Sequence, residues 1–490
     1  MTSTPDPMIA QLRQEFETLL TVVTGPAART QTADAVERLL FRRVLALGGG
    51  LLTLFFRTRA AARPAGPVTS ADGTPLAYHD RRPTTYFSVF GKLSFRRHAF
   101  TAPGQPVVCP LDADLSLPGR CYSALLREWA TYASTDAAYR ETQALLERIL
   151  GLSLSTQALE TITQEDAGDV AAFYAQPPAP ATPAAGGTIL VAQADGKGVP
   201  RVLPPAAERP VRRGKGQPAN RKREAIVTAL YTIAPYPRTP ADVVAALLDE
   251  PAATTPVTRP RPIQKEVRAT LDGKAAALAR LADRAGQRTH AAIQHRVALT
   301  DGAEALQQQM TTRLPAFTLV LDIIHATEYL WDAANALLGE RHPGRTAWVR
   351  RRLEQVLAGQ TTAVIAALTK ITTTRRLSAP RRQVVERTVG YYQRNLPFMH
   401  YDAYLARGWP IGTGVVEGAC GHLVKDRMEQ AGMRWTQPGA QAVLDLRGVR
   451  LSGDWDAYWP WHRQQQHHRL YGAGTPMAPL IEDQALTPAA

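Results

Sequence analysis

The feature that most constrains this chain is a proline-rich break between two longer stretches that can fold. Residues 176–187 read QPPAPATPAAGG, and stacked prolines with small residues can neither pack a core nor hold a helix. We therefore predict a linker at 176–187 with a separate core on either side of it. The length of 490 residues is enough for roughly two to four domains.

The stretch before the linker begins with helices and a small hairpin. Apolar residues recur at three- and four-residue spacing between residues 8 and 60, which predicts an N-terminal helical region at 1–62. Beyond a Pro/Gly segment, Tyr86 to Phe100 alternates apolar and polar residues around Gly91, which is typical of a hairpin.

Two helical segments follow the hairpin. Gly151 separates them in the manner of a helix-turn-helix, so we assign 63–175 to a hairpin plus helix-turn-helix-like DNA-binding region. The second segment, Thr156 to Asp169, is acidic and contains no Arg or Lys. A plain packed pair of helices is therefore the better interpretation of this motif than base recognition.

The stretch after the linker alternates strands with helices, which predicts a mixed α/β sheet. The predicted strands are Thr188–Ala194, Ala225–Ala234, Arg296–Thr300 and Phe317–Leu321, with a helix from Gln264 to His295. Residues 326–405 are helical and basic, and we predict that they form a helical insertion between 188–325 and 406–454. Residues 455–490 are assigned to a C-terminal tail, in which His462, His467 and His468 have no matching ligands at metal-binding spacing.

Charge and cysteine content restrict the partners and the compartment. Lys and Arg number 57 against 43 Asp and Glu, and the net charge of +14 attracts polyanions, so double-stranded DNA is the first partner to consider. Cys109, Cys121 and Cys420 form no CxxC pair, which excludes a disulfide framework and suits a cytoplasmic location. The apolar run Val44–Phe56 is shorter than the roughly 18 residues that cross a bilayer, so we expect no membrane span.

Three aspartates follow predicted strands in the second half. Asp195 ends the first apolar run, Asp301 follows the third strand and Asp322 follows the fourth. Adjacent strand ends would bring these carboxylates together, and such a cluster is costly unless a divalent cation neutralises it. Ordinary turn chemistry explains any one of them, whereas three in one domain favour a metal site.

A fourth carboxylate lies at the start of a predicted helix. Residues 408–435 read GWPIGTGVVEGACGHLVKDRMEQAGMRW, in which Thr413 can cap a helix that runs to about Gln430. Glu417 falls in the first turn, on one face with Cys420, and this face could press the carboxylate against the sheet. A solvated glutamate stabilised by the helix dipole is the simpler explanation of this residue alone.

Together these motifs resemble the Kra-type insertion-sequence transposases of bacteria, over nearly the whole chain. The resemblance is carried by ADGKG at 194–198, TDGAEAL at 300–306, LDIIHATEYL at 321–330, the block at 408–435, LDLRGVRLSGDWDAYW at 444–459, and upstream by FSVFGKLSFRRHAF and CPLDADLSLPGRCYS. The paired cysteines that family members often carry after the hairpin are missing here, so zinc-assisted DNA binding is not expected.

The resemblance implies an α/β catalytic core of RNase H-like type, related to Mutator-type enzymes, with a helical insertion and a mainly α N-terminal region with a small β-hairpin. It implies a DDE transposase whose catalytic and metal-binding triad is Asp195, Asp301 and Glu417, with Asp322 and His325 as an accessory motif. Two Mg²⁺ or Mn²⁺ ions would activate a water for nicking or a DNA 3′-hydroxyl for strand transfer. A histidine bonded to Glu328 explains His325 equally well.

DNA contacts are predicted on basic clusters and on the hairpin. Clustered Lys and Arg neutralise phosphates at the ends of an element, and a homo-oligomer is expected to assemble on that DNA in the bacterial nucleoid. Sequence preference is expected from residues 1–175, where Arg96, Arg97 and His98 lie on the hairpin. The predicted DNA-binding residues are Arg96, Arg97, Arg212, Arg213, Lys215, Arg221, Lys222, Arg223, Lys425 and Arg427.

Two other functions fit the sequence. A domesticated DNA-binding protein would keep the fold and the basic clusters without cutting, but retention of the three carboxylates argues against it. A stand-alone metal-dependent nuclease would not need the large N-terminal half.

Overall fold

The computed structural model describes residues 7–62, 66–70, 72–176, 187–203, 222–250, 258–430 and 432–477. The chain divides into two compact units, the first formed by Met1–Asp169 with Asp456–Ala490 and the second by Val170–Trp455. The boundary after Asp169 precedes the predicted linker, of which residues 177–186 lie outside the described part of the chain. The C-terminal segment belongs to the first unit, so its assignment to a separate tail was wrong.

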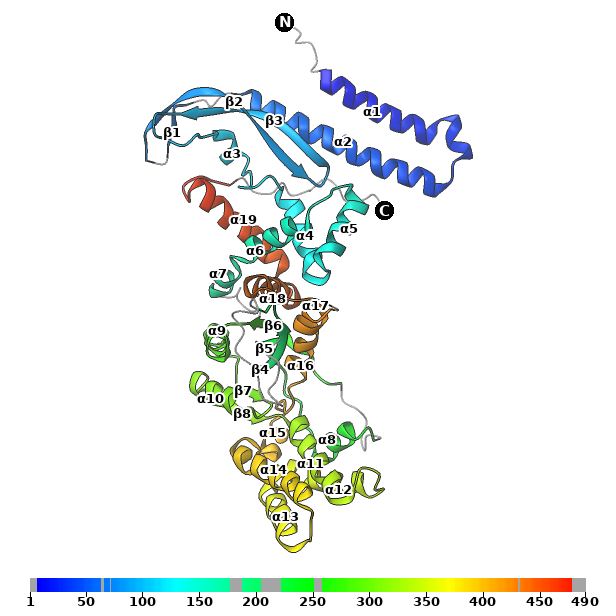
Figure 1. Ribbon diagram of the computed structural model, residues 1–490, viewed down its shortest axis with the longest axis vertical. Coiled ribbons are helices and arrows are strands. Elements are labelled where there is room, and N and C mark those ends of the chain that lie inside the picture. Colours follow the sequence, from blue (N-terminus) through cyan, green and yellow to red (C-terminus); the bar gives the residue numbers. More distant parts are fainter. Residues whose placement is uncertain are drawn as a thin grey trace. The chain divides into compact units, whose positions relative to one another are not determined.

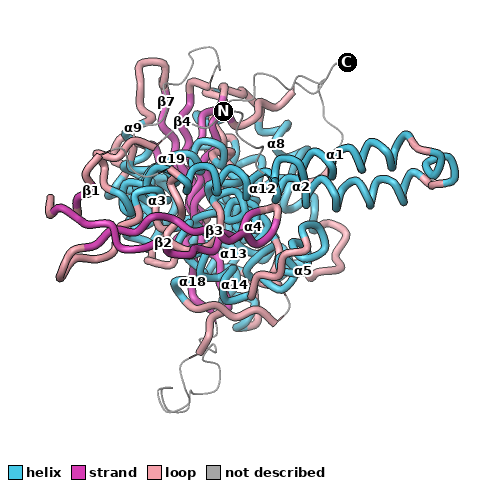
Figure 2. Tube along the Cα trace, turned by 90° about the horizontal axis from the view of Figure 1, so that it is seen from above, coloured by secondary structure: helices cyan, strands magenta, loops and turns pink. Residues whose placement is uncertain are grey.

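The first unit begins with a helical hairpin. Helix α1 (Pro7–Thr24) is followed by the short 3₁₀ helix η1 (Pro26–Thr30) and by α2 (Ala33–Ala61), and Figure 2 shows α1 and α2 side by side. The Thr32 hydroxyl caps α2 by accepting a hydrogen bond from the Ala35 amide. Among the described helices, α2 is long and apolar enough to cross a membrane, with 11% of its most apolar window buried. We expected no membrane span because the apolar run Val44–Phe56 is short. The helix that contains this run has 29 residues, so its length no longer supports that expectation.

A long β-hairpin packs on α2. Strands β1 (Val68–Thr69), β2 (Pro75–Ser88) and β3 (Gly91–Thr101) form an antiparallel sheet in the order β1-β2-β3. The hairpin turns at Gly91, whose φ of 118° a residue with a side chain rarely adopts. The hairpin extends beyond the predicted Tyr86–Phe100 because β2 begins at Pro75, in a polar stretch that apolar alternation does not reveal.

The remaining described helices of the first unit are α3 (Pro110–Asp114), α4 (Ala124–Asp136), α5 (Tyr139–Leu150), α6 (Thr156–Ala167) and α19 (Trp455–Tyr471). Of these, α4, α5 and α6 share a small core. Gly151 ends α5 in the left-handed conformation, as the predicted break between two helices requires. Leu126, Leu146 and Ile162 pack together in this core, so the two predicted helices pack against each other.

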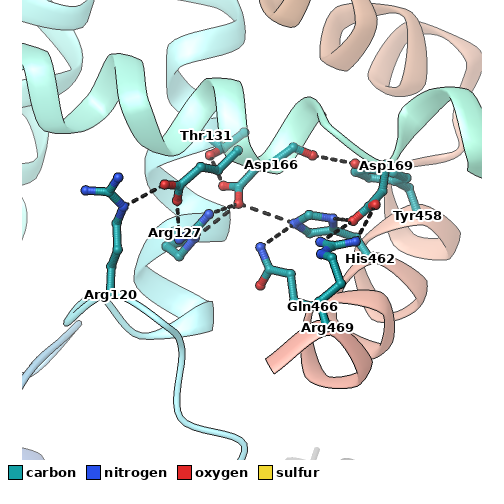
Figure 3. Close-up of polar contacts among 10 residues, drawn as sticks. Arg120, Arg127, Thr131, Asp166, Asp169, Tyr458, His462, Gln466 and Arg469 are labelled. Atoms are coloured by element: carbon teal, nitrogen blue, oxygen red, sulfur yellow. Dashed lines mark hydrogen bonds and ion pairs between the residues drawn. The ribbon is translucent and has the colours of Figure 1, made fainter. Parts of the chain in front are cut away.

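A buried ionic cluster joins α4, α6 and α19 (Figure 3). Asp166, which is fully buried, accepts hydrogen bonds from Arg127 Nε at 3.1 Å and from the Thr131 hydroxyl at 2.7 Å. His462 Nδ1 lies 2.6 Å from Asp169 Oδ2, and its Nε2 lies 3.3 Å from Asp166 Oδ1. His462 therefore has a structural role that tail composition could not suggest.

The second unit is built on a sheet of mixed direction. Its described strands are β4 (Ile189–Pro200), β5 (Lys222–Ile233), β6 (Ile263–Thr270), β7 (His295–Thr300) and β8 (Thr318–Leu321), in the order β6-β5-β4-β7-β8. β4 pairs antiparallel with β5 and parallel with β7, and β8 is parallel to β7. The predicted helix from Gln264 was wrong at its start, because residues 263–270 pair with β5 instead. Only α9 (Lys274–Gln287) is helical there.

Helices cover both faces of this sheet (Figure 1). α9 and α10 (Glu304–Arg313) pack on one face. The other face is covered by α11 (Ile323–Leu338), α16 (Gly414–Ala419), the π-helical turn η5 (Cys420–Lys425) and α18 (Gln437–Ser452).

Residues 326–405 are helical, as predicted. They comprise most of α11 with α12 (Arg345–Leu357), α13 (Thr361–Thr374), α14 (Ala379–Asn395), η4 (Leu396–Phe398) and all but the last residue of α15 (Tyr401–Ala406). The short helices α7 (Val170–Ala175), α8 (Pro240–Leu247) and α17 (Asp426–Met428) complete the unit.

Candidate active site

Three aspartates follow the last paired residues of the parallel pairing between β4, β7 and β8. Gln193 on β4 pairs with Leu299 on β7, and Thr300 on β7 pairs with Leu321 on β8. Extending the first register by two residues places Asp195 beside Asp301. Extending the second register by one residue places Asp301 beside Asp322. Neighbouring strands lie about 4.8 Å apart, so residues from three distant segments form one row.

The three aspartates also share one face of the sheet. Side chains alternate between faces along a strand. Val191, Leu299 and Val320 belong to the core that the insertion helices cover. Asp322 lies two residues after Val320, and Asp301 two after Leu299, so both point to the same face as those core residues. Asp195 lies four residues after Val191 and faces the same way.

Gln193 fixes the start of α16 on β4. Its side chain is fully buried, and its Oε1 accepts a hydrogen bond from the Val416 amide at 2.9 Å. Its Nε2 donates to the Tyr231 hydroxyl at 3.0 Å and to the Gly412 carbonyl at 3.3 Å. The sequence interpretation missed this residue, although a glutamine in the middle of a buried apolar strand was a sign that it bonds to something.

Thr413 joins two carboxylates instead of capping the helix. Its side chain forms no capping bond to α16, so that prediction was wrong. Its hydroxyl lies 2.5 Å from Asp322 Oδ2 and 2.6 Å from Glu417 Oε1. One hydroxyl has one proton and can donate to only one of them, so the second close oxygen pair needs a proton on a carboxyl or a cation nearby.

The electrostatics of Asp322 reflect this crowding. Asp322 is fully buried, and burial, with the nearby Glu417 carboxylate, raises its pKa to about 6 against the hydrogen bonds from Thr413 and Ile324 and the charge of His325. The position of this carboxyl is fixed, because it also caps α11 through the Ile324 amide at 2.9 Å.

His325 lies on the first turn of α11 beside these carboxylates. Its Nε2 is 3.9 Å from Asp322 Oδ2, and its Nδ1 is 3.1 Å from Glu328 Oε2. Burial opposes the charged imidazolium, but Asp322, Glu328 and Asp301 outweigh it and raise the pKa of His325. The contact with Glu328 is the one that the simpler interpretation of His325 expected.

Asp322, His325 and Glu417 together can hold a metal ion. One ligand atom from each lies within 4.8 Å of the other two. Among the described residues, neither Asp195 nor Asp301 belongs to this group. The structure therefore brings the predicted catalytic Glu417 closest to the predicted accessory pair.

Asp195 lies beside this group but does not end its strand. β4 continues to Pro200 and pairs Asp195 with Val227, so the prediction of a strand end was wrong, because the antiparallel hairpin with β5 carries the strand onward. Asp195 Oδ1 accepts a hydrogen bond from the Gly196 amide at 2.6 Å, and Oδ2 lies 3.4 Å from Cys420 Sγ. Cys420 follows Glu417 on the same helical segment, so this contact joins that segment to Asp195.

Asp301 follows β7 directly, as predicted, and α14 holds its loop. The Tyr391 hydroxyl donates to the Asp301 carbonyl at 2.9 Å, and Arg394 donates to the Gly302 carbonyl at 3.0 Å. The Asp301 carboxylate accepts from the Ala303 amide at 2.9 Å. The helical insertion thus positions one of the predicted triad residues.

The predicted DNA-binding residues of the second unit have different environments. Arg427 is fully buried with its guanidinium 4.8 Å from the Trp435 ring, so its assignment to a phosphate-binding surface was wrong. The irregular π-helical turn before it changes which side chains of this segment face outward. Lys425 is exposed.

Lys222 and Arg223 are held by other residues. Lys222 pairs with Glu429 at 2.5 Å with 56% of its side chain exposed. Arg223 donates to the Leu271 carbonyl and to Gln437. Arg212, Arg213, Lys215 and Arg221 lie outside the described residues.

Comparison with known proteins gives a partial similarity. No protein-family model matches the chain. Over 77 residues the chain is 35% identical to the "UPF0236 protein in vanSb 3'region" of Streptococcus gallolyticus. This stretch covers 16% of the chain and spans only 17% of the length of that protein.

Proposed function

We propose that this chain is a DNA transposase of a bacterial insertion sequence, of the Kra type, that binds element ends and catalyses metal-dependent strand cleavage and strand transfer. The observation that carries the proposal is the row of Asp195, Asp301 and Asp322 on one sheet face, with Glu417 bonded to the same threonine as Asp322. The strand order β6-β5-β4-β7-β8 supports an RNase H-like core.

The donors in this site fit divalent cations. Carboxylate oxygens are the ligands that Mg²⁺ and Mn²⁺ prefer, and a histidine among them suits Mn²⁺. Asp322, His325 and Glu417 would hold one ion, and Asp195 and Asp301 would add ligands along the row. A bound ion would activate a water or a 3′-hydroxyl and stabilise the leaving oxygen. Gln193 and Thr413 would keep Glu417 and Asp322 in place.

The proposal is tested by cleavage of DNA that carries the sequences flanking the coding region. We expect cutting only with Mg²⁺ or Mn²⁺. Asp195→Asn, Asp301→Asn, Asp322→Asn and Glu417→Gln should each abolish it while leaving DNA binding within a few-fold, because each removes a metal ligand and no cation. Asp332→Asn, an exposed carboxylate on α11, and Asp426→Asn, after η5, are matched controls that should cut normally.

Cutting in excess EDTA would contradict a metal mechanism. Normal cutting by Asp301→Asn together with loss in Asp322→Asn would remove Asp301 from the triad and put Asp322 in its place. Normal cutting by all four variants would refute the proposed site.

We further propose that the protein acts as a homo-oligomer on nucleoid DNA in the cytoplasm. The helical hairpin carries large apolar side chains that are 45–54% exposed, and exposed apolar patches mark surfaces for association. They are Phe16, Phe41, Val44, Leu51 and Phe55.

A further inference from the structure

The two faces of the β2–β3 hairpin differ in what they carry. On one face the cross-strand pairs are Arg82 with Arg97, Thr84 with Phe95 and Tyr86 with Leu93. On the other they are Arg81 with His98, Pro83 with Arg96, Thr85 with Ser94 and Phe87 with Lys92. The first set alternates with the second along both strands.

The first face is covered. Phe95 is buried and stacks on Phe56 of α2 with ring centres 4.4 Å apart, and Tyr86 meets the same ring at 5.0 Å. Arg97 forms an ion pair with Asp112 of α3. Arg97, which the sequence placed among the DNA contacts, is therefore turned toward the protein.

The second face is open and basic. Arg81, Lys92, Ser94 and Arg96 are exposed along it. The acidic residue of the two strands, Asp80, pairs with Arg82 at 3.4 Å. The open face thus combines positive charge with short hydroxyl side chains and presents no carboxylate to repel a phosphate.

Arg96 is held in place over this face. Its guanidinium donates to the Arg81 carbonyl at 2.5 Å, while Arg81 donates to the carbonyls of Arg96 and Ala60, each at 3.3 Å. A guanidinium has five N–H donors, so Arg96 keeps donors for a ligand after this bond. Holding the side chain in advance reduces the entropy lost on binding.

We infer that this open face enters the major groove of double-stranded DNA and reads base edges at the ends of the element, with Arg96 as the main base contact. The groove is about 12 Å wide and admits a two-stranded β-ribbon, and arginine bonds guanine through two N–H groups. The exposed residues from Lys92 to Arg96 span four residue steps, roughly 14 Å, and His98 beyond them is half-buried with both ring nitrogens inaccessible. Ser94 lies between Lys92 and Arg96 on the same face, and Lys92 would contact phosphate. This assignment rests on the proposed function, which supplies the DNA.

The face favours duplex DNA over other polyanionic partners. The deep, narrow major groove of A-form RNA does not admit such a ribbon, and recognition of single-stranded RNA uses exposed aromatic platforms. Phe87 on this face packs against Tyr122 with ring centres 5.5 Å apart, and Tyr78, which lies beyond these four pairs, packs against the rings of His98 and Phe100 at 5.7 and 5.8 Å. A membrane surface would require large apolar side chains that insert, whereas the exposed residues of the four cross-strand pairs are Arg81, Pro83, Lys92, Ser94 and Arg96.

The test measures affinity of the full-length protein for a duplex of the element end and for a scrambled duplex, by fluorescence anisotropy in EDTA. Arg96→Gln should weaken end binding by roughly tenfold to a hundredfold, the effect of one lost bidentate base contact, and should change scrambled binding less than threefold. Lys92→Gln should weaken both duplexes equally and flatten the log–log salt dependence by about 0.9. Arg97→Gln on the covered face is the matched control and should keep the preference for the end.

The outcomes separate the ribbon from the proposed function. If Arg96→Gln keeps the full preference for the end while the wild-type protein still cleaves that end, the ribbon assignment is wrong and the transposase proposal stands. If the wild-type protein neither prefers nor cleaves the end, the transposase proposal itself fails. Equal competition by single-stranded RNA or by anionic vesicles would overturn the assignment of duplex DNA. Circular dichroism of each variant checks that it is folded.

Discussion

The buried ionic cluster of the first unit makes a stability prediction that can be worked out from its contacts. Replacing Asp166 by asparagine keeps the size of the side chain but removes its charge. Arg127, whose side chain is 4% exposed, and the buried His462 would then lose their shared anion. Breaking a buried ion pair by removing one partner costs about 3–5 kcal/mol.

The remaining contacts place the expected cost at the lower end of that range. Arg127 keeps Glu165 at 3.0 Å, and His462 keeps Asp169 at 2.6 Å. We therefore expect Asp166→Asn to lower the free energy of unfolding of the first unit by about 3 kcal/mol. A unit of about 200 residues loses roughly 2–4 °C of Tm per kcal/mol, so the Tm should fall by about 6–12 °C.

Calorimetry with tryptophan fluorescence from α19 provides the assay. Asp34→Asn is the matched control, because Asp34 pairs with Arg38 at 3.0 Å on the surface with 71% of its side chain exposed. An exposed pair of this kind contributes about 0.3–0.5 kcal/mol. If Asp166→Asn lowered the Tm no more than Asp34→Asn, the cluster would contribute no net stability and the reasoning from burial would fail.

Four other outcomes are expected. Burial disfavours the charged form of His462, but hydrogen bonds to Asp166 and Asp169 raise its pKa, so its stabilisation should be complete below about pH 6.5 and decline as the pH rises through the folded value. Burial raises the pKa of Asp169, but hydrogen bonds from His462 and Arg469 outweigh it and lower this pKa to about 2, so stability should also decline below about pH 4. His462→Gln should abolish the alkaline decline of the Tm. Gln193→Leu should reduce cleavage at least about tenfold because it leaves the Val416 amide and Tyr231 hydroxyl without this partner, whereas the exposed Gln308→Leu should not. Val44→Glu should shift the mass of the DNA-free protein, measured by light scattering, toward that of the monomer. An unchanged oligomer would show that this surface is not the oligomer interface. Loss of vesicle binding in the same variant would indicate a membrane role instead.

The parts of the site that depend on local pattern could be predicted from the sequence. Apolar runs that end in a polar residue located β7 and β8 and hence Asp301 and Asp322. The same rule misplaced the end of β4, because pairing with β5 continues past Asp195. It also missed β6, where pairing with a neighbouring strand outweighs a helix-like composition.

The parts that depend on distant partners could not be predicted. Gln193 bonds Val416 and Thr413 bonds Asp322 across more than ninety positions of sequence in each case. No periodicity encodes such a pair, since it exists only once the sheet and α16 are packed together. Arg427 shows the reverse case, because composition marks an arginine as a surface cation and only packing against Trp435 shows it to be buried.

The acidic helix α6 shows why the charge of a sequence segment is a poor guide to the charge that DNA meets. The acidity of Thr156 to Asp169 counted against DNA recognition near this helix. However, the charge of Asp166 is neutralised by contacts with Arg127 and His462, and Asp169 accepts two hydrogen bonds from Arg469 at 2.7 and 2.8 Å. These cations come from α4 and α19, so the charges cancel within the unit and add little to its outer field. The acidity of α6 is therefore no argument against DNA on the open face of the hairpin, where the exposed arginines and Lys92 remain uncompensated by carboxylates of their own strands.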